Sequence, residues 1–545
     1  MGNGSTLSPS LGIAAPRVAA APQVPVAEPS PAQVRLFLLG LGLATGMEFY
    51  SNDSMNLILP DIAGTIGVSF DEASWLLTVY SCSLFFGVPV SIWMERRFGY
   101  RRFLIGTIIV FAVTAAAGPF APDFATMLLA RAIQGFAGAG LYVWWRASIY
   151  MLLSKAQRSA SLMRVSTMLY LSSAAGLLAS GYITDHFNWR LAFLPNLVYA
   201  VGAIALLLRS IPSTAASAPA ARADRTDVIG IALLALALVS LQIALNRGQI
   251  DDWFDSAFIP RLAWTSVVAA VLFAFWQTSA HNGAPLLQFD LLRDRRVLSS
   301  ALIGIFSGII LSGSLYALPE FLRNIDPEPH SATRTGQVMC AYALAAAAIR
   351  PLVLPLVARI GQRKTIAFAL VMLVASMLLF VRLLTTGTPD AAYVAPLVLY
   401  AFCLAPLLPA VGSGTVGRVE QARLLDGVSL YMTFRQFGAS IGVAVLTILI
   451  EQRETLHSSR LFEHLRTASV TTGDWLLRAT AIIASRDGES AIESSHMATK
   501  LLAVAGSRQA ATLAYADAFL FMALIGVAAL CLVPIIPPTP TEPKK

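Results

Sequence analysis

Apolar runs of about 20 residues restrict what this chain can fold into more than any other feature of its sequence. That length is what an α-helix needs to cross the ~30 Å hydrocarbon core of a lipid bilayer. The sequence contains about fourteen such runs, at residues 35–59, 74–94, 102–120, 124–147, 163–184, 191–209, 228–246, 261–280, 299–322, 336–358, 364–384, 392–416, 426–450 and 513–536. We therefore predict an all-α polytopic membrane protein with fourteen spans.

Composition supports a membrane location. Of the 545 residues, 56% are hydrophobic and only 13% are charged, and the mean hydropathy is +0.67. Soluble domains carry roughly 25% charged residues, so a soluble enzyme, a disordered chain and a disulfide scaffold are excluded as descriptions of the whole chain. The net charge of +8 does not indicate a nucleic-acid partner, because Lys and Arg stand in short loops rather than in a basic domain.

Cysteine and histidine offer no metal or cofactor site. The four cysteines lie inside apolar runs, without metal-ligand or redox spacing, and are expected to be small core residues: Cys82, Cys340, Cys403 and Cys531. The six histidines are scattered through loops with no metal-binding spacing. A polytopic membrane enzyme is therefore disfavoured, and no cofactor is expected.

Basic residues between the runs predict the orientation of the chain. With a cytoplasmic N-terminus, inner loops hold roughly three Lys or Arg for each one in the short outer loops, as expected for cytoplasmic loops. An even number of spans then places the C-terminus in the cytoplasm and residues 451–512 outside. EQRETLHSSRLFEHL in that segment predicts an amphipathic helix that continues the thirteenth run. Residues 1–33, rich in Ala, Pro and Ser, and residues 537–545 are expected to be disordered cytoplasmic tails.

Ionisable side chains inside the apolar runs mark the candidate functional site, because they are costly in hydrocarbon. The polar residues of the first run repeat at helical spacing and form one stripe, Thr45, Glu48, Asn52 and Asn56, with Asp53 at its edge. Burial favours the protonated carboxyl group, whereas hydration or a nearby arginine favours the ionised one. Glu48 and Asp53 are thus candidate proton carriers, although Asp53 could instead be interfacial.

Arginines within the runs form the second candidate group. Arg131 and Gln134 interrupt the fourth run, and we expect Arg131 to pair with Glu48 or Asp53. Arg350 lies in the tenth run, where it either faces the interior or snorkels to an interface.

Two further arginines lie in the thirteenth and fourth runs. Arg435 opens RQFGASIG in the thirteenth run, whose small residues allow close helix contact, and it too could snorkel. Arg146 follows Trp144 and Trp145 at the inner end of the fourth run. There we expect an aromatic belt with a snorkelling arginine.

Six motifs resemble those of the major facilitator superfamily. SIWMERRFGYRR, at residues 91–102, is similar to the superfamily signature G-x-L-x-D-R-x-G-R-R, and RAIQGFAGAG resembles its second signature. WRLAFLPN, NRGQIDDWFDS, RQFGASIG and LAYADAF resemble the fourteen-span drug:proton antiporters of the EmrB/QacA type. These motifs occur in the expected order, and the resemblance extends over nearly all of the chain between the first and last runs.

The resemblance implies a major facilitator fold with two six-helix bundles, residues 34–209 and 299–536, and two extra spans in the segment 210–298. It implies a central substrate cavity and alternating access, with proton influx driving the export of hydrophobic or amphipathic small molecules across the inner membrane. It also implies a latch after the second run, formed by Glu95, Arg96, Gly99 and Arg101, where glycine suits a tight turn. Likeness to the EmrB subgroup implies a periplasmic adaptor and a TolC-type outer-membrane channel, with residues 451–512 as a docking surface.

The sequence departs from the family pattern in three of its motifs. In the signature at residues 91–102, Ser91 replaces the first Gly and Glu95 replaces the Asp. Ser51 stands where the family has its proton-carrying Asp, so Glu48 and Asp53 are expected to take over that role. In the antiporter motif G-P-x-x-G-G, Gly176 and Gly181 remain, but Leu177 replaces Pro and Ser180 replaces Gly.

These departures leave a second function open. It is an organic-anion or metabolite exporter with altered or absent proton coupling, in which Arg350 and Arg435 face the anion.

Overall fold

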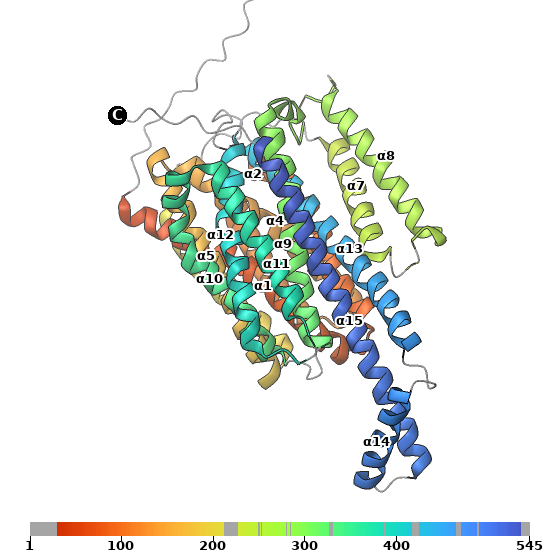
Figure 1. The fold of residues 1–545 in the computed structure, drawn as a ribbon. Coiled ribbons are helices and arrows are strands. Elements are labelled where there is room, and N and C mark those ends of the chain that lie inside the picture. Colours follow the sequence, from red (N-terminus) through yellow and green to blue (C-terminus); the bar gives the residue numbers. More distant parts are fainter. Residues whose placement is uncertain are drawn as a thin grey trace, which may run out of the picture.

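The computed structural model describes residues 30–211, 227–248, 251, 253–279, 281–283, 285–325, 331–385, 387–416, 424–464, 470–487 and 490–535. Most of the two predicted tails and residues 212–226 of the linker lie outside this part of the chain. So do residues 417–423, which include Arg418 and Arg423 of a predicted inner loop. The described residues contain no β-strand, and their dominant element is the long α-helix (Figure 1).

The long helices follow the predicted runs closely. Their bounds are α1 Pro31–Ile66, α2 Phe70–Phe98, α3 Tyr100–Ala117, α4 Phe124–Leu152, α5 Lys155–His186, α6 Pro195–Ser210, α7 Val228–Arg247, α8 Phe258–Thr278, α9 Arg295–Asn324, α10 Ala332–Ile360, α11 Gln362–Leu383, α12 Val394–Val416, α13 Leu424–His464, α14 Val470–Asp487 and α15 Ala491–Leu532. Thirteen of these, α2–α13 and α15, are long and apolar enough to cross a membrane. The first predicted span, α1, is 36 residues long, but Glu48, Asp53 and their polar neighbours lower its mean hydropathy. Its start at Pro31 also moves the end of the predicted tail by a few residues.

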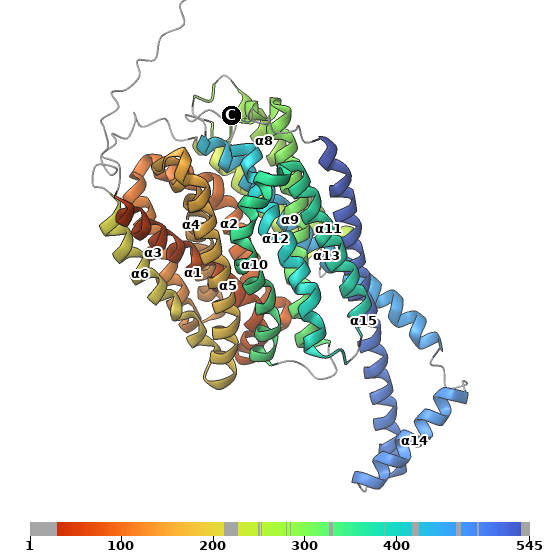
Figure 2. The ribbon, with the colours of Figure 1, turned by 60° about the vertical axis from the view of Figure 1, so that its left-hand side comes forward.

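Two groups of six helices make up the body of the molecule. In the first group, α1 packs against α5 and α6, while α2 and α3 pack against α4. In the second, α9 packs against α13, α11 against α12 and α15, and α10 against α12. The remaining pair, α7 and α8, pack against each other, and α7 lies beside α2 and α13 (Figures 1 and 2). The two groups, which we call the first and second bundles, meet mainly along α5 and α10.

The same tight turn recurs at equivalent places in the two bundles. Gly99 joins α2 to α3, and Gly361 joins α10 to α11, each as a single residue with φ of 82°. This left-handed conformation favours glycine, which has no Cβ. The backbone N–H of Gly99 donates to the carbonyl of Glu95 at 2.8 Å and so closes the end of α2. Gly99 therefore has a structural role in the turn.

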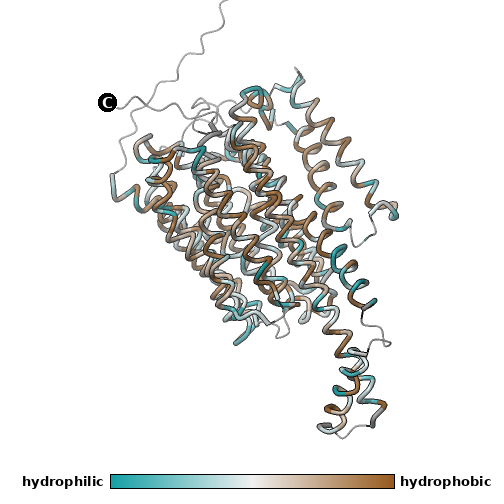
Figure 3. The backbone as a smooth tube through the Cα atoms, viewed as in Figure 1, coloured by the Kyte–Doolittle hydropathy of each residue, from teal (hydrophilic) through white to brown (hydrophobic). Residues whose placement is uncertain are grey.

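The last two spans continue far beyond the bilayer. α13 has 41 residues and α15 has 42, so each is about 60 Å long, roughly twice the hydrocarbon thickness. Their ends project from the body together with α14 (Figures 1 and 2). Figure 3 shows hydrophobic residues along the bundle helices and more hydrophilic ones toward the helix ends. α13 continues as one helix to His464, as expected. α15 begins 22 residues before the predicted start of its span. The prediction began too late because the first turns of α15 contain polar residues, which do not belong to an apolar run.

Three of the four cysteines are buried as expected, but Cys531 is exposed on α15. The expectation was wrong for Cys531 because an apolar run shows that a helix crosses the membrane, not which of its faces other helices cover. All four thiols are free.

The two glycines of the antiporter motif allow α5 to approach its neighbours closely. A Cβ added at Gly176 would lie 2.8 Å from the carbonyl oxygen of Tyr50 in α1. A Cβ added at Gly181 would lie 2.6 Å from the carbonyl oxygen of Ala332, at the start of α10. Gly176 thus fits α5 into its own bundle, whereas Gly181 fits it against the other bundle.

We predict that Gly181→Val destabilises the protein by about 1–3 kcal/mol, because the added methyl groups would collide with the α10 backbone. Gly106→Val is the matched control, since an added Cβ there would meet nothing within 4 Å. Thermal unfolding of both variants in detergent is the measurement. Equal melting temperatures for the two variants would contradict close packing of α5 against α10.

Candidate functional site

A cavity of about 310 Å³ lies between the two bundles. Residues of α1, α2, α4 and α5 line it on one side, and residues of α9, α10 and α13 line it on the other. A volume of this size lies at the lower end of the range for small-molecule sites. The cavity is therefore the natural place to look for a cargo site.

Both candidate proton carriers lie on the cavity wall. Glu48 is only 6% exposed, and its Oε1 accepts a hydrogen bond of 3.3 Å from the hydroxyl of Tyr80 in α2. Asp53 accepts hydrogen bonds from the hydroxyls of Ser173 in α5 and Tyr342 in α10. Because Tyr342 belongs to the second bundle, Asp53 joins the two bundles within the cavity.

The stripe on α1 faces the cavity over more than two turns. Asn52 and Asn56 line the cavity together with Glu48 and Asp53. Arg435 of α13 also lines it and lies within electrostatic range of Glu48. Its guanidinium stacks over the ring of Tyr142 at 5.1 Å. Arg435 is thus a cavity residue and does not snorkel.

Arg131 does not pair with Glu48 or Asp53, so this expectation was wrong. Its Nη1 donates to Gln134 at 2.7 Å, and its guanidinium stacks over the ring of Tyr80 at 4.5 Å. Tyr80 stands between Arg131 and Glu48, with its ring against the cation and its hydroxyl on the carboxylate. The contact between Arg131 and Glu48 is therefore indirect and runs through this tyrosine.

Ser51, where the family resemblance led us to expect an aspartate, is hydrogen-bonded to Gln134. The Nε2 of Gln134 donates to the hydroxyl of Ser51 at 2.9 Å, and both residues are buried. A chain of polar contacts therefore runs from Ser51 through Gln134 and Arg131 to Tyr80 and on to Glu48. Glu48, on the cavity wall, is the member of this chain of contacts that carries a carboxyl group.

Arg350 is buried in the membrane interior and does not snorkel. Its side chain lines the cavity and is 5% exposed. Its Nη1 donates to the carbonyl oxygen of Ala405, and its Nη2 donates to the hydroxyl of Ser166 in α5 at 3.0 Å. Its Nε is buried without a hydrogen-bond partner.

Arg146 is a cavity residue that the sequence prediction assigned to an aromatic belt. Both tryptophans are buried, because other helices rather than lipid cover them: Trp144 packs against Tyr100 and Phe103 of α3, and Trp145 lines the cavity. Arg146 lines the cavity and stacks over Trp145 at 4.4 Å.

The proposed latch shows contacts within the first bundle. Arg101 donates to the carbonyl oxygen of Leu208 in α6 at 3.4 Å. The side chain of Arg96 lies outside the described residues. In this conformation the described contact of Arg101 does not reach the second bundle.

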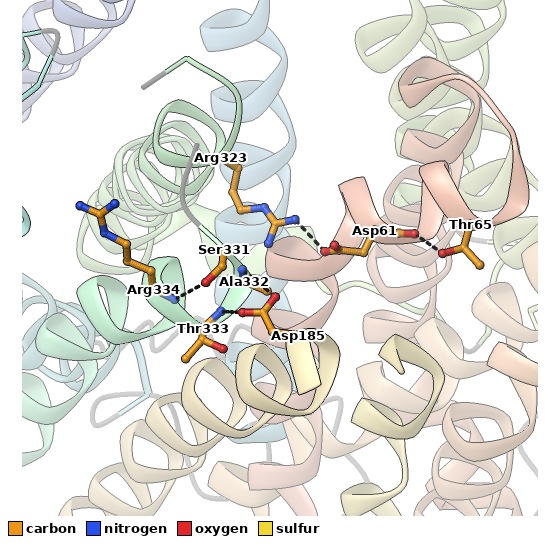
Figure 4. Close-up of polar contacts among 8 residues, drawn as sticks. All are labelled: Asp61, Thr65, Asp185, Arg323, Ser331, Ala332, Thr333 and Arg334. Carbon is orange, nitrogen blue, oxygen red and sulfur yellow. Dashed lines mark hydrogen bonds and ion pairs between the residues drawn. The ribbon is translucent and has the colours of Figure 1, made fainter. Parts of the chain in front are cut away.

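Polar contacts join the two bundles at the outer end of the cavity (Figure 4). Arg323 of α9 forms an ion pair of 2.7 Å with Asp61 of α1. Asp185, near the end of α5, accepts hydrogen bonds from the backbone N–H groups of Ala332 and Thr333, at 3.2 and 2.7 Å. A carboxylate at the N-terminus of α10 is stabilised by the partial positive charge of that helix end. Together with the close contact at Gly181, these interactions hold the two bundles together at this end of the cavity, which the orientation predicted from the loop charges places outside.

Sequence reasoning missed this outer closure. Asp61 and Arg323 are 262 positions apart, and nothing in the local pattern of either residue indicates its partner. In the sequence, Arg323 is one of the few basic residues of the predicted outer loops.

A helical bundle pair with a central cavity, ionisable groups in its walls and a closure at one end defines a polytopic membrane transporter. Residues 41–443 match the family model described as Major Facilitator Superfamily. The chain belongs to the Major Facilitator Superfamily, and it is a transporter rather than an enzyme.

Known relatives agree with this assignment. The chain is 24% identical over 432 residues to the multidrug export protein EmrB of Escherichia coli K12, covering 79% of this chain and 83% of that protein. It is 24% identical to the fatty acid resistance protein FarB of Neisseria gonorrhoeae, covering 83% of this chain and 87% of that protein. A solved POT family transporter in complex with 5-aminolevulinic acid shares the fold, with a TM-score of 0.61, 12% identity, and coverage of 93% and 97%.

We predict that reversing one charge of the outer ion pair opens the cavity to the outside. Asp61→Arg and Arg323→Asp each place like charges together, so labelling of a cysteine at Asn56→Cys by an impermeant maleimide rises several-fold in a background free of native cysteines. The expected rise in labelling is modest because partly exposed ion pairs contribute about 1 kcal/mol or less. Labelling is measured from the outside of intact cells.

Two matched variants control this measurement. The double swap of Asp61→Arg with Arg323→Asp restores the pair and returns labelling to its low level. Asp390→Arg breaks an ion pair with Arg334 within the second bundle and leaves labelling unchanged. Unchanged labelling in both single reversals would show that this pair does not hold the outer end closed.

Proposed function

We propose that the protein exports hydrophobic or amphipathic small molecules from the cytoplasm in exchange for protons. The observation that carries this proposal is the position of Glu48 and Asp53 on the wall of a cavity shared by both bundles. The names of the relatives, which concern multidrug export and resistance to fatty acids, agree with cargo of this kind.

Asp53 supplies a physical link between protonation and bundle movement. When ionised, its carboxylate accepts hydrogen bonds from Ser173 and Tyr342, which belong to different bundles. When protonated, one oxygen becomes a donor and its attraction for both hydroxyls weakens. Proton binding therefore loosens a contact between the bundles, as alternating access requires.

The lining of the cavity suits apolar cargo. Leucine side chains from both bundles face it, among them Leu84 of α2, Leu169 of α5 and Leu311 of α9. Burial of apolar surface contributes about 25 cal/mol per Å², which favours a hydrophobic compound without requiring one shape. Such a surface supports a broad rather than a narrow range of cargo.

The finer features of the assignment are also part of this proposal. We place the protein in the inner membrane with both termini in the cytoplasm, and we divide it into residues 34–209, 210–298 and 299–536. Glu95, Arg96, Gly99 and Arg101 would latch the cytoplasmic side. The projecting helices would meet a periplasmic adaptor and, through it, a TolC-type outer-membrane channel.

We predict that Glu48→Gln and Asp53→Asn each abolish proton-driven transport, because a side-chain amide, unlike a carboxyl group, cannot take up and release a proton near neutral pH. Everted membrane vesicles with an imposed proton gradient are assayed for uptake of two dyes, cationic ethidium and anionic anilinonaphthalene sulfonate. Uptake falls to the level seen with an uncoupler, while protein abundance stays normal.

Asp474→Asn, which removes an exposed acid from α14, is the control and transports normally. Full, uncoupler-sensitive uptake in both cavity variants would overturn the assignment of the proton carriers.

A further inference from the structure

The cytoplasmic half of the cavity holds two arginines, one from each bundle. From their geometry we infer that Arg146 and Arg350 together form a binding site for the anionic head group of an amphipathic substrate. This inference rests on the proposed function, since it assumes that the cavity holds cargo, and it adds the charge class and the orientation of that cargo.

Arg350 is a buried cation whose binding capacity is not filled by the protein. Its two described hydrogen bonds go to neutral oxygens, those of Ala405 and Ser166, and its Nε is buried without a partner. A buried donor without an acceptor is destabilising, and more so when it is charged. A ligand oxygen at this position would remove that destabilisation.

Arg146 offers a second cation at the same end of the cavity. Stacking on Trp145 orients its guanidinium, and its described hydrogen bond goes to the sulfur of Met432 at 3.5 Å, which is a weak acceptor. Among the described residues, neither Arg146 nor Arg350 forms an ion pair with a carboxylate. The two arginines also lie within electrostatic range of each other.

Two like charges held near each other in a low-dielectric interior repel. An anion bound between them attracts both guanidinium groups and so offsets their mutual repulsion. The planar guanidinium also presents its donors in the fork geometry that carboxylate, sulfonate and phosphate groups accept. The arrangement therefore selects an oxyanion rather than a cation or a neutral polar group.

Apolar side chains begin next to this pair. Leu404 precedes Ala405, whose carbonyl Arg350 contacts, and Leu169 lies one turn beyond Ser166 on α5; both line the cavity. Toward the outer side, the wall becomes acidic at Glu48 and Asp53. The anionic head is therefore placed toward the cytoplasm, and the apolar body extends toward the middle of the membrane.

This site gives the substrate a role in the transport cycle. Arg146 lies on α4 and Arg350 on α10, so an anion that binds both draws the two bundles together at the cytoplasmic side. Without the anion, repulsion between the arginines opposes that closure. A loaded transporter closes inward access more readily than an empty one, because the ligand binds the closed state better.

The test compares the binding of three eight-carbon probes to the full-length protein in a neutral detergent. They are octanesulfonate, octyltrimethylammonium and octanol, which share one tail and differ in head-group charge. We expect octanesulfonate to bind at least about tenfold more tightly than octanol, the ratio for one charged hydrogen bond. Arg146→Gln and Arg350→Gln each abolish that preference, whereas Arg350→Lys keeps part of it because lysine retains the charge without the fork.

Two controls make the result interpretable. Arg359→Gln removes an exposed arginine from the same end of α10 and leaves the preference unchanged. Retained binding of octanol shows that the cavity of each variant is still folded, and Arg350→Lys serves where a glutamine variant is unstable.

Equal binding of the three probes, preference for the cation, or a sulfonate preference that survives both glutamine variants would overturn the inference. The proposed function fails separately. Proton-driven uptake of ethidium without any sulfonate preference would leave the exporter intact and remove the anion site. A sulfonate preference without proton-driven uptake of either dye would support the anion site and contradict the proposed proton-driven export.

Discussion

Burial of ionisable side chains inside the membrane is the constraint on which the rest of this structure depends. A charged group at the centre of a bilayer costs at least ~2.5–3.5 kcal/mol, so Glu48, Asp53, Arg350 and Arg435 persist only where helices shield them from lipid. The two bundles provide that shielding, and hydroxyl groups and aromatic rings provide partners. Tyr80 serves as such a partner twice, because its ring stacks on Arg131 while its hydroxyl binds Glu48.

The charges in the cavity are separated along its axis. In the proposed orientation, the acids of α1 lie toward the middle and outer side, while Arg146 and Arg350 lie toward the cytoplasm. Several contacts in this region join the bundles, including Asp53 with Tyr342 and Arg350 with Ser166. In the proposed function, a proton at Asp53 and cargo at Arg350 act on contacts between the bundles, which is where a transporter must respond in order to alternate.

Much of the fold follows from the sequence by simple physics. An apolar run of bilayer length becomes a helix, and the helical repeat of Glu48, Asn52 and Asn56 puts these side chains on one wall of the cavity. The identity of contacts between helices does not follow in this way. Arg131 meets Tyr80 instead of an acid, and the partner of Arg323 is 262 positions away. Arg146 was misassigned because two tryptophans and an arginine at a helix end look alike whether lipid or protein covers them.

The most direct test of the account measures proton movement driven by cargo alone. Liposomes containing the protein and a pH-sensitive dye are given a gradient of anilinonaphthalene sulfonate with no pH difference at the start. We predict that cargo movement drives protons in the opposite direction, and that the combined Glu48→Gln and Asp53→Asn variant shows no such proton flow. Cargo flux without proton movement, or proton movement that persists in the double variant, would contradict the exchange of protons at these carboxyl groups.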